Sequence, residues 1–167
     1  QVDVDELRER RLHHLELVAR DREARALGLG RAHGGATQAV ADAVERCRSR
    51  EPVPELVDES DDLHVWIDRV RLTAVLAHLI RNAQEATERT GHVTVRVAQA
   101  DGGVLIEVVD DGGGMEPEFV RERLFRPFDT TKGSKGMGIG AYQARTFVMD
   151  AGGSLRVESE PGQGTRF

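Results

Sequence analysis

This sequence of 167 residues is poor in cysteine, and it has no long hydrophobic run. Its single cysteine, Cys47, excludes an internal disulfide and any metal cluster built from cysteines. A chain with one cysteine also favours a reducing, cytosolic compartment. No apolar run approaches the roughly 20 residues that a membrane span needs, and the N-terminus carries no visible signal peptide.

Lysine is also rare, and most of the basic residues are arginines. The formal net charge is -6, which argues against a surface for duplex nucleic acid. Hydrophobic residues make up 39% and charged residues 31% of the chain, as expected for a soluble globular domain. The two lysines, Lys132 and Lys135, both lie in one glycine-rich segment, and this concentration favours binding of an anion there.

The N-terminal segment predicts a separate helical arm. Residues Val4–Leu27 contain no Pro or Gly and carry a narrow apolar seam at helical spacing, suited to one partner helix and so to a homodimer. The alternative is a solvated helix that covers its own domain. The sequence GLGRAHGG at 28–35 is typical of a helix end and a joint. We therefore expect an arm over 1–35 and a domain over 36–167.

The rest of the chain predicts an α+β domain in which helices alternate with antiparallel hairpins. Helices are expected at 36–47, with Thr37 as N-cap, at 69–89 after an Asp68 cap, at 117–124 and at 140–151. Strands are expected at 55–57, 63–67, 92–98, 104–109, 154–159 and 165–167. This order predicts one mixed, mostly antiparallel sheet covered on one face by helices.

Two polar clusters stand out in this framework. In HLIRNAQEA, residues 78–86, the side chains of His78, Asn82 and Glu85 share one helix face beside the buried stripe. Alone this pattern means little, because an Asn in a helix is usually just solvated. In VVDDGGGM, residues 108–115, an apolar strand delivers Asp110 and Asp111 to three consecutive glycines. A carboxylate beside bare backbone suits a ligand with N–H donors, although an ordinary Asp-Gly turn has the same sequence.

Two further clusters follow closely along the chain. LFRPFDTTK, residues 124–132, places two Phe residues where they could anchor a loop to the body. GSKGMGIG, residues 133–140, runs into a helix whose first N–H groups suit phosphate oxygens. The spacing fits neither a P-loop nor a Rossmann turn, and the motifs of eukaryotic-type protein kinases are absent.

In combination, the four clusters resemble the catalytic and ATP-binding domain of bacterial sensor histidine kinases. That domain has the two-layer α/β sandwich (Bergerat) fold shared with gyrase-type and Hsp90-type ATPases. The segments match the N box, the D-x-G-x-G box, the F box and the second glycine box, and GQGTRF at 162–167 matches the closing Gly-Thr segment. The resemblance covers about 36–167. The amino-acid sequence of the third and fourth segments also resembles that of kinases of the exosortase (PEP-CTERM) sorting system.

The resemblance implies roles for particular residues. Asn82 would hold Mg²⁺, Asp110 would accept from the adenine amine, and Thr165 would support Asp110. His78, Asn82 and Lys132 would be catalytic. Residues from about Met115 to Gly136 would form a lid hinged by Phe125 and Phe128. The implied ATP-binding residues are Asn82, Glu85, Ala86, Asp110, Gly112, Gly114, Met115, Phe128, Thr130, Thr131, Lys132, Gly136, Met137, Gly138, Ile139, Gly140 and Thr165.

The resemblance also implies the reaction and the partners. A Glu stands at the position of His78 in gyrase-type members and activates water, so a His there favours phosphoryl transfer over hydrolysis. His13 and His14 do not match the pattern of a phosphoacceptor. The expected partners are therefore a dimerisation domain that bears the acceptor histidine and a response regulator, with this chain as the cytoplasmic part of a membrane-anchored kinase. The alternatives are a standalone anti-sigma-type serine kinase, against which the F box argues, and a nucleotide-gated binding module.

Overall fold

The computed structural model describes residues 35–60, 67–100, 103–129 and 138–167, together with the backbone of a short strand at Glu16–Leu17. Its helices are α3 (Ala36–Cys47), α4 (Arg69–Ala86), α5 (Pro117–Glu122) and α6 (Gly140–Asp150). Its strands are β1 (Glu16–Leu17), β2 (Glu55–Glu59), β3 (Val93–Ala100), β4 (Gly103–Asp110), β5 (Glu158–Glu160) and β6 (Gly164–Arg166). The expected strand at 63–67 falls almost wholly outside the described residues.

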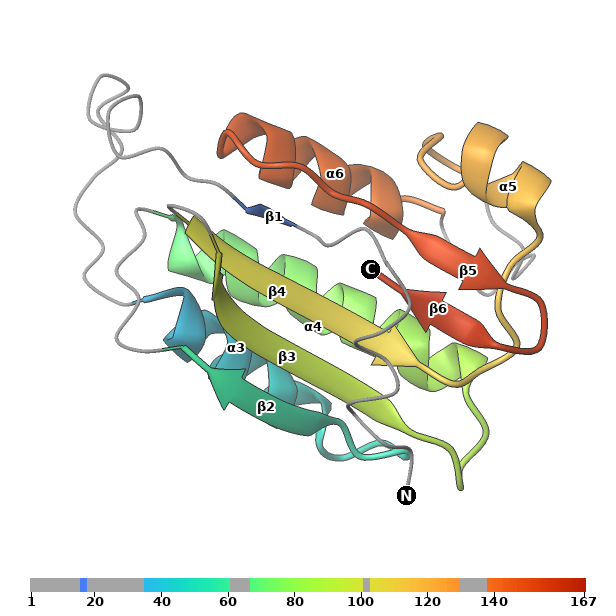
Figure 1. Cartoon of the computed structure of the whole chain (residues 1–167), viewed down its shortest axis with the longest axis horizontal. Coiled ribbons are helices and arrows are strands. Elements are labelled where there is room, and N and C mark those ends of the chain that lie inside the picture. Colours follow the sequence, from blue (N-terminus) through green and yellow to red (C-terminus); the bar gives the residue numbers. More distant parts are fainter. Residues whose placement is uncertain (1–15, 18–34, 61–66, 101–102, 130–137) are drawn as a thin grey trace.

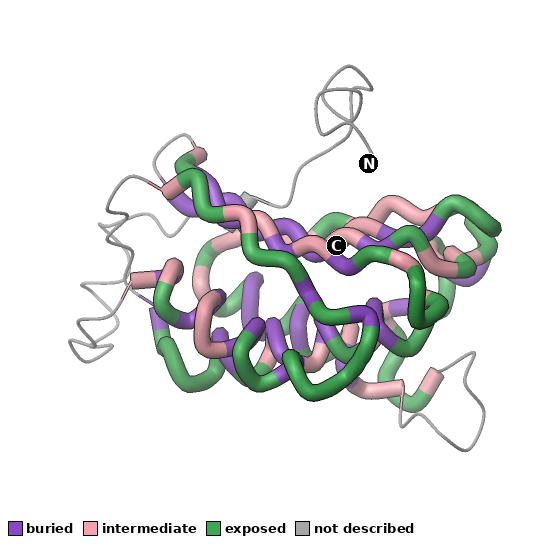
Figure 2. Tube along the Cα trace, turned by 90° about the horizontal axis from the view of Figure 1, so that it is seen from below, coloured by how far each residue is buried: buried purple, intermediate pink, exposed green. Residues whose placement is uncertain are grey.

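One sheet with the strand order β2-β3-β4-β6-β5 forms the first layer, and the helices form the second (Figure 1). The pair β2–β3 is parallel, whereas β3–β4, β4–β6 and β5–β6 are antiparallel. Figure 2, turned by 90°, shows the two layers edge-on with purple, buried positions between them. The expected mixed, mostly antiparallel sheet covered on one face by helices is thus confirmed.

The core lies where alternating strand residues meet the apolar stripes of the helices. Val93, Val95 and Val97 of β3 and their neighbours Val104, Ile106 and Val108 of β4 are buried. They face a stripe on α4 of which Leu72, Leu76, Leu79, Ile80 and Ala83 are buried and Val75 is half-buried. Burial of each large aliphatic side chain contributes about 1.5–3 kcal/mol, so this interface fixes α4 on the sheet.

The helix ends follow local rules in some places and tertiary contacts in others. The Asp68 carboxylate accepts from the backbone N–H of Arg71 at 3.0 Å, which confirms it as the N-cap of α4. Thr37 was wrongly expected to cap α3. Gly35 is the N-cap, and the Thr37 hydroxyl hydrogen-bonds Ser60 at the end of β2 instead. Pro117 occupies the first turn of α5, as predicted.

The expected helix over Val4–Leu27 is wrong at Glu16–Leu17. These two residues form β1, which pairs antiparallel with Leu105 and Val104 of β4 (Figure 1). The pairing with β6 covers only the other end of β4, so the backbone groups that face away from β3 near Leu105 and Val104 need a partner. Strand pairing satisfies them and overrides the local helical pattern. The remainder of the predicted arm lies outside the described residues.

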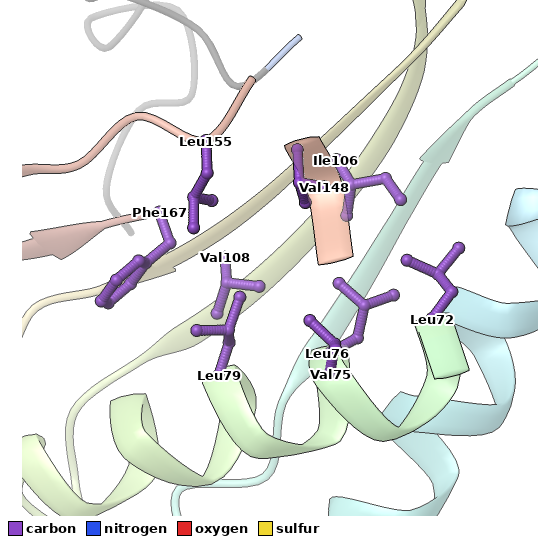
Figure 3. Close-up of a pocket in the computed structure, with 9 residues that line it drawn as sticks. All are labelled: Leu72, Val75, Leu76, Leu79, Ile106, Val108, Val148, Leu155 and Phe167. Carbon is purple, nitrogen blue, oxygen red and sulfur yellow. The ribbon is translucent and has the colours of Figure 1, made fainter. Parts of the chain in front are cut away.

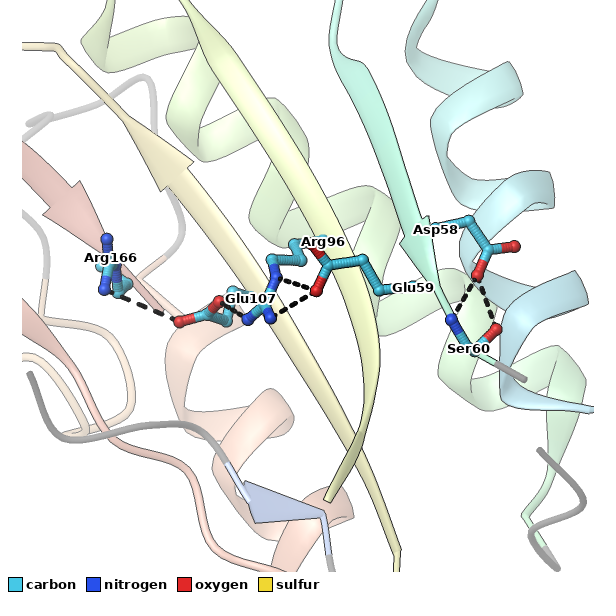
Figure 4. Close-up of polar contacts among 6 residues, drawn as sticks. All are labelled: Asp58, Glu59, Ser60, Arg96, Glu107 and Arg166. Carbon is cyan, nitrogen blue, oxygen red and sulfur yellow. Dashed lines mark hydrogen bonds and ion pairs between the residues drawn. The ribbon is translucent and has the colours of Figure 1, made fainter. Parts of the chain in front are cut away.

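The sheet face that points away from the helices carries a row of charges. The Arg96 guanidinium of β3 donates to Glu107 of β4 at 2.8 Å and to Glu59 of β2 at 3.0 Å (Figure 4). Arg166 of β6 lies 3.7 Å from the other oxygen of Glu107. Because Glu107 is only 5% exposed, these arginines compensate a carboxylate that has lost most of its water.

A small cavity of about 20 Å³ remains inside the apolar layer between α4, α6 and β4 (Figure 3). It is lined by Leu72, Val75, Leu76, Leu79, Ile106, Val108, Val148, Leu155 and Phe167. A cavity without polar groups on its walls offers water no hydrogen bonds. It belongs to the core and is distinct from the polar residues described next.

Candidate functional site

The polar face of α4 supplies the first part of the site. Helical spacing places His78, Asn82 and Glu85 along one edge of the buried stripe. His78 and Asn82 are half-buried, whereas Glu85 is exposed. The Glu85 carboxylate accepts from Arg50 at 3.1 Å, so one of its oxygens is held toward the segment between α3 and β2.

The end of α4 lies directly against the turn that follows β4. The backbone N–H of Gly113 donates to the carbonyl of Ala86, the last residue of α4, at 3.0 Å. A Cβ atom at Gly112 would lie 2.3 Å from the same carbonyl oxygen, so a larger residue does not fit. The Gly112 N–H donates to the Asp110 carboxylate at 3.0 Å. These contacts set Asp110 beside the end of the helix that carries Asn82.

The start of α6 lies against the same helix. A Cβ atom at Gly140 would lie 1.7 Å from Nε2 of His78, so the imidazole fills the space that this glycine leaves. The residue at the N-cap of α6, Ile139, offers no side-chain hydrogen bond to the first turn. The N–H groups there carry the positive end of the helix dipole. Gly138, just before, has φ +63°.

The closing strand completes the site from the side of the sheet. Thr165 of β6 is the register partner of Asp110, and the two residues are 6% and 5% exposed. Gly164 has φ +92°, and a Cβ atom there would lie 1.9 Å from the Asp110 carbonyl oxygen. This close approach of β6 to β4 brings a hydroxyl beside the carboxylate.

Gly114 and Met115 begin the segment that leaves the sheet. Gly114 has φ +65°, and a Cβ atom there would lie 1.9 Å from the carbonyl oxygen of Glu160. The Met115 N–H donates to the hydroxyl of Ser159 at 2.8 Å, and its side chain packs against the core. The start of this segment is therefore fixed to the β5–β6 hairpin.

The structure corrects the role expected for one of the two Phe residues. Phe125 packs against the core, and the Arg145 guanidinium lies 4.9 Å from its ring centroid. Phe128 is 78% exposed, so its side chain does not anchor the loop to the core. Instead its N–H donates to the Gly138 carbonyl at 3.0 Å, and its φ of 67° is rare for a residue with a side chain.

Five predicted site residues lie outside the described residues: Thr130, Thr131, Lys132, Gly136 and Met137. The structure also shows contacts at the site that the sequence did not indicate. The sequence did not single out Ser159, which bonds to both Met115 and Thr165. It named Asp111 together with Asp110, but it did not indicate the contact of Asp111 with His92. The contacts of Ser159 and Asp111 became visible only through strand register, which no local pattern indicates.

Asp111 joins the turn that follows β4, at residues 111–114, to the start of β3. Its carboxylate accepts from the backbone N–H of His92 at 2.7 Å and from the His92 ring at 3.0 Å. Partial burial raises the pKa of Asp111, but these hydrogen bonds outweigh it and hold the pKa below its usual value. The charge of Asp111 thereby stabilises the turn that carries Asp110.

The two-layer domain, with a glycine turn resting on the end of α4, belongs to a class of ATPase domains. This chain belongs to the family of histidine kinase-, DNA gyrase B- and HSP90-like ATPases, whose model matches residues 67–167. ATP use follows from this membership.

Curated relatives are sensor proteins, and some of them are named sensor histidine kinases. The chain is 41% identical over 109 residues to the C4-dicarboxylate transport sensor protein DctB of Rhizobium meliloti, a match that covers 64% of this chain and 17% of DctB. It is 33% identical over 156 residues to the sensor histidine kinase ZraS of Klebsiella oxytoca, covering 93% of this chain and 28% of ZraS. The chain thus spans less than a third of the length of these relatives.

Solved structures agree on the fold. The mycobacterial sensor histidine kinase MprB superposes with a TM-score of 0.69 at 25% identity, over 80% of this chain and 91% of that one. The catalytic domain of the histidine kinase ThkA gives 0.66 at 28% identity, over 80% and 90% of the two chains. Full-length ShkA in complex with AMPPNP gives 0.58 at 28% identity, over 79% and 28%.

Within the described residues, no helix has both the length and the apolar character that crossing a membrane requires.

Proposed function

We propose that this chain is the catalytic part of a two-component sensor kinase and transfers the γ-phosphoryl group of ATP to a histidine on a separate segment. A response regulator would then receive the group. The observation that carries the proposal is the meeting of two distant segments at α4. The glycine turn bonds to Ala86, and the start of α6 lies against His78.

The adenine end of the site would lie at Asp110. An ionised carboxylate is an acceptor only, so it suits the exocyclic amine of adenine. The hydrogen bond from Gly112 holds this carboxylate in place before a ligand arrives. Only a glycine fits at position 112, because a Cβ atom there would collide with Ala86. No side chain at this position therefore obstructs a bound base.

The phosphate end would lie between Asn82 and the start of α6. The free N–H groups of a helix N-terminus favour phosphate oxygens. Among the described residues, no group of three or more His, Cys, Asp or Glu could hold a metal ion. The donors therefore fit Mg²⁺, which keeps most of its waters and needs few protein ligands, better than a metal that demands a full protein cage. Asn82 would hold this ion, which supplies charge neutralisation when bound.

His78 supports transfer rather than hydrolysis. Its imidazole is half-buried and lies against the start of α6, at the phosphate end of the proposed site. Phosphoryl transfer depends mainly on positioning and electrostatic stabilisation, and a carboxylate that activates water would divert the group. In transfer, the bond from the γ-phosphorus to ADP breaks as a bond to the acceptor nitrogen forms.

The experiment incubates the chain with ATP labelled at the γ-phosphate, Mg²⁺ and a purified histidine-containing dimerisation domain. The label is expected on that domain as an acid-labile, alkali-stable phosphoramidate. Asn82→Ala should abolish labelling with the fold intact, and Gln38→Ala, which removes an exposed amide on α3, should retain it. An acid-stable phosphoserine, or release of inorganic phosphate alone, would contradict the proposal.

A further inference from the structure

Three polar side chains form a row across the sheet next to the proposed adenine site. Asp110 on β4 is the register partner of Thr165 on β6, and Thr165 is in turn the partner of Ser159 on β5. Register partners on adjacent strands point to the same face of a sheet. The row therefore runs carboxylate, hydroxyl, hydroxyl along the face that carries the helices.

The outermost hydroxyl, that of Ser159, has three hydrogen-bond partners. It accepts from the Met115 N–H at 2.8 Å, it donates to the Gly164 carbonyl at 3.0 Å, and it lies 2.9 Å from the Thr165 hydroxyl. A serine hydroxyl has one proton and two lone pairs. Since a carbonyl can only accept, the single proton of Ser159 goes to Gly164.

This assignment fixes the direction of the bond between the two hydroxyls. Ser159 has no second proton, so Thr165 must donate to Ser159. The remaining capacity of the Thr165 oxygen then consists of lone pairs only. Asp110, when ionised, is also an acceptor only. The row therefore presents two acceptors and no donor to whatever base or bridging water lies beside it.

We infer that Ser159 is a positioning residue for base selection, because it holds the Thr165 hydroxyl as an acceptor. This inference rests on the proposed function, and it adds a residue that increases the selectivity of the site for adenine. Two acceptors match the amine of adenine, directly or through water. They oppose the carbonyl that guanine carries at the same position, since two acceptors without a proton between them repel. Without Ser159, the Thr165 hydroxyl can rotate and donate to guanine.

The test measures dissociation constants for ATP and GTP by calorimetry with the whole chain. In Ser159→Ala, the ratio of the GTP constant to the ATP constant should fall about threefold to tenfold, as expected for one hydrogen bond. Ser159→Thr keeps the hydroxyl and should keep the ratio. The matched control is Ser60→Ala, which removes a hydroxyl that bonds to Asp58 and Thr37 near the end of β2.

A second comparison tests whether Ser159 acts through Thr165. In a Thr165→Val background, Ser159→Ala should change the ratio no further. Equal weakening for both nucleotides in Ser159→Ala, or an unchanged ratio, would overturn the inference while nucleotide binding itself stands. A chain that binds neither nucleotide would overturn the proposed function as well.

Discussion

The His92 side chain and the Asp111 carboxylate form a clip between the start of β3 and the end of β4. The ring nitrogen Nδ1 lies 3.0 Å from one carboxylate oxygen, and the backbone N–H of His92 donates to the other at 2.7 Å. Gly91 lies so close that a Cβ atom there would be 2.6 Å from the same carboxylate. The clip fixes the turn that holds Asp110, yet Asp111 itself is exposed.

This clip predicts a pH-dependent contribution to stability. The pKa of Asp111 is lower in the folded chain than in the unfolded one, so the unfolded state binds more protons in acid. The contribution is therefore present above about pH 4 and disappears as the pH falls through the folded pKa. Asp111→Asn should lower the melting temperature by about 1–2 °C at pH 7. Thermal melts of both proteins should converge in acid, and a constant difference across pH would contradict this role.

Asp110 should dominate recognition of the base. Asp110→Asn replaces a charged acceptor by an amide and should weaken ATP binding by about 10-fold to 100-fold, measured by calorimetry. Asp58→Asn removes a carboxylate near the end of β2, where it bonds to Ser60, and should leave the affinity unchanged. Equal affinities in the Asp110 variant and the unaltered chain would exclude Asp110 from the site.

The contact between Gly140 and His78 predicts a reversal in the effect of one mutation. An alanine in a helix is normally more stabilising than a glycine by roughly 0.5–1 kcal/mol. At position 140, however, its Cβ atom would lie 1.7 Å from the imidazole, which must move. Gly140→Ala should therefore destabilise the unaltered chain and stabilise the His78→Ala variant. Denaturant titrations of the four proteins would measure the change in the free energy of unfolding caused by Gly140→Ala in each background. A change of the same sign in both backgrounds would refute the contact.

The adjacent glycines Gly113 and Gly114, in the turn that follows β4, should tolerate alanine very differently. Gly114 has φ +65° and its Cβ atom would lie 1.9 Å from a backbone oxygen, whereas a Cβ atom at Gly113 meets nothing within 4 Å. The left-handed conformation alone costs a residue with a side chain about 1–2 kcal/mol. Gly114→Ala should lower the free energy of unfolding by at least about 2 kcal/mol. Gly113→Ala should change it little. Similar losses at both positions would argue against this turn geometry.

Periodicity and local chemistry predicted the elements that this fold uses most. The apolar stripe from Leu72 to Ala83 predicted α4 and its buried face, and Asp68 predicted where that helix begins. Alternation predicted β3 and β4. The four motif segments also indicated the family, since their order along the chain is specific even though each one alone is ambiguous.

Pairing across the sheet was decided only by the tertiary structure. Local sequence favoured a helix at Glu16–Leu17, but the backbone of β4 made it a strand. Thr37 has the chemistry of an N-cap, yet its hydroxyl forms a hydrogen bond with Ser60 instead. Ser159 gains its partners from the register of β5, β6 and β4, which depends on a turn length that no local preference fixes. Sequence thus determined which residue types were available, and the contacts between distant segments determined what each polar group does.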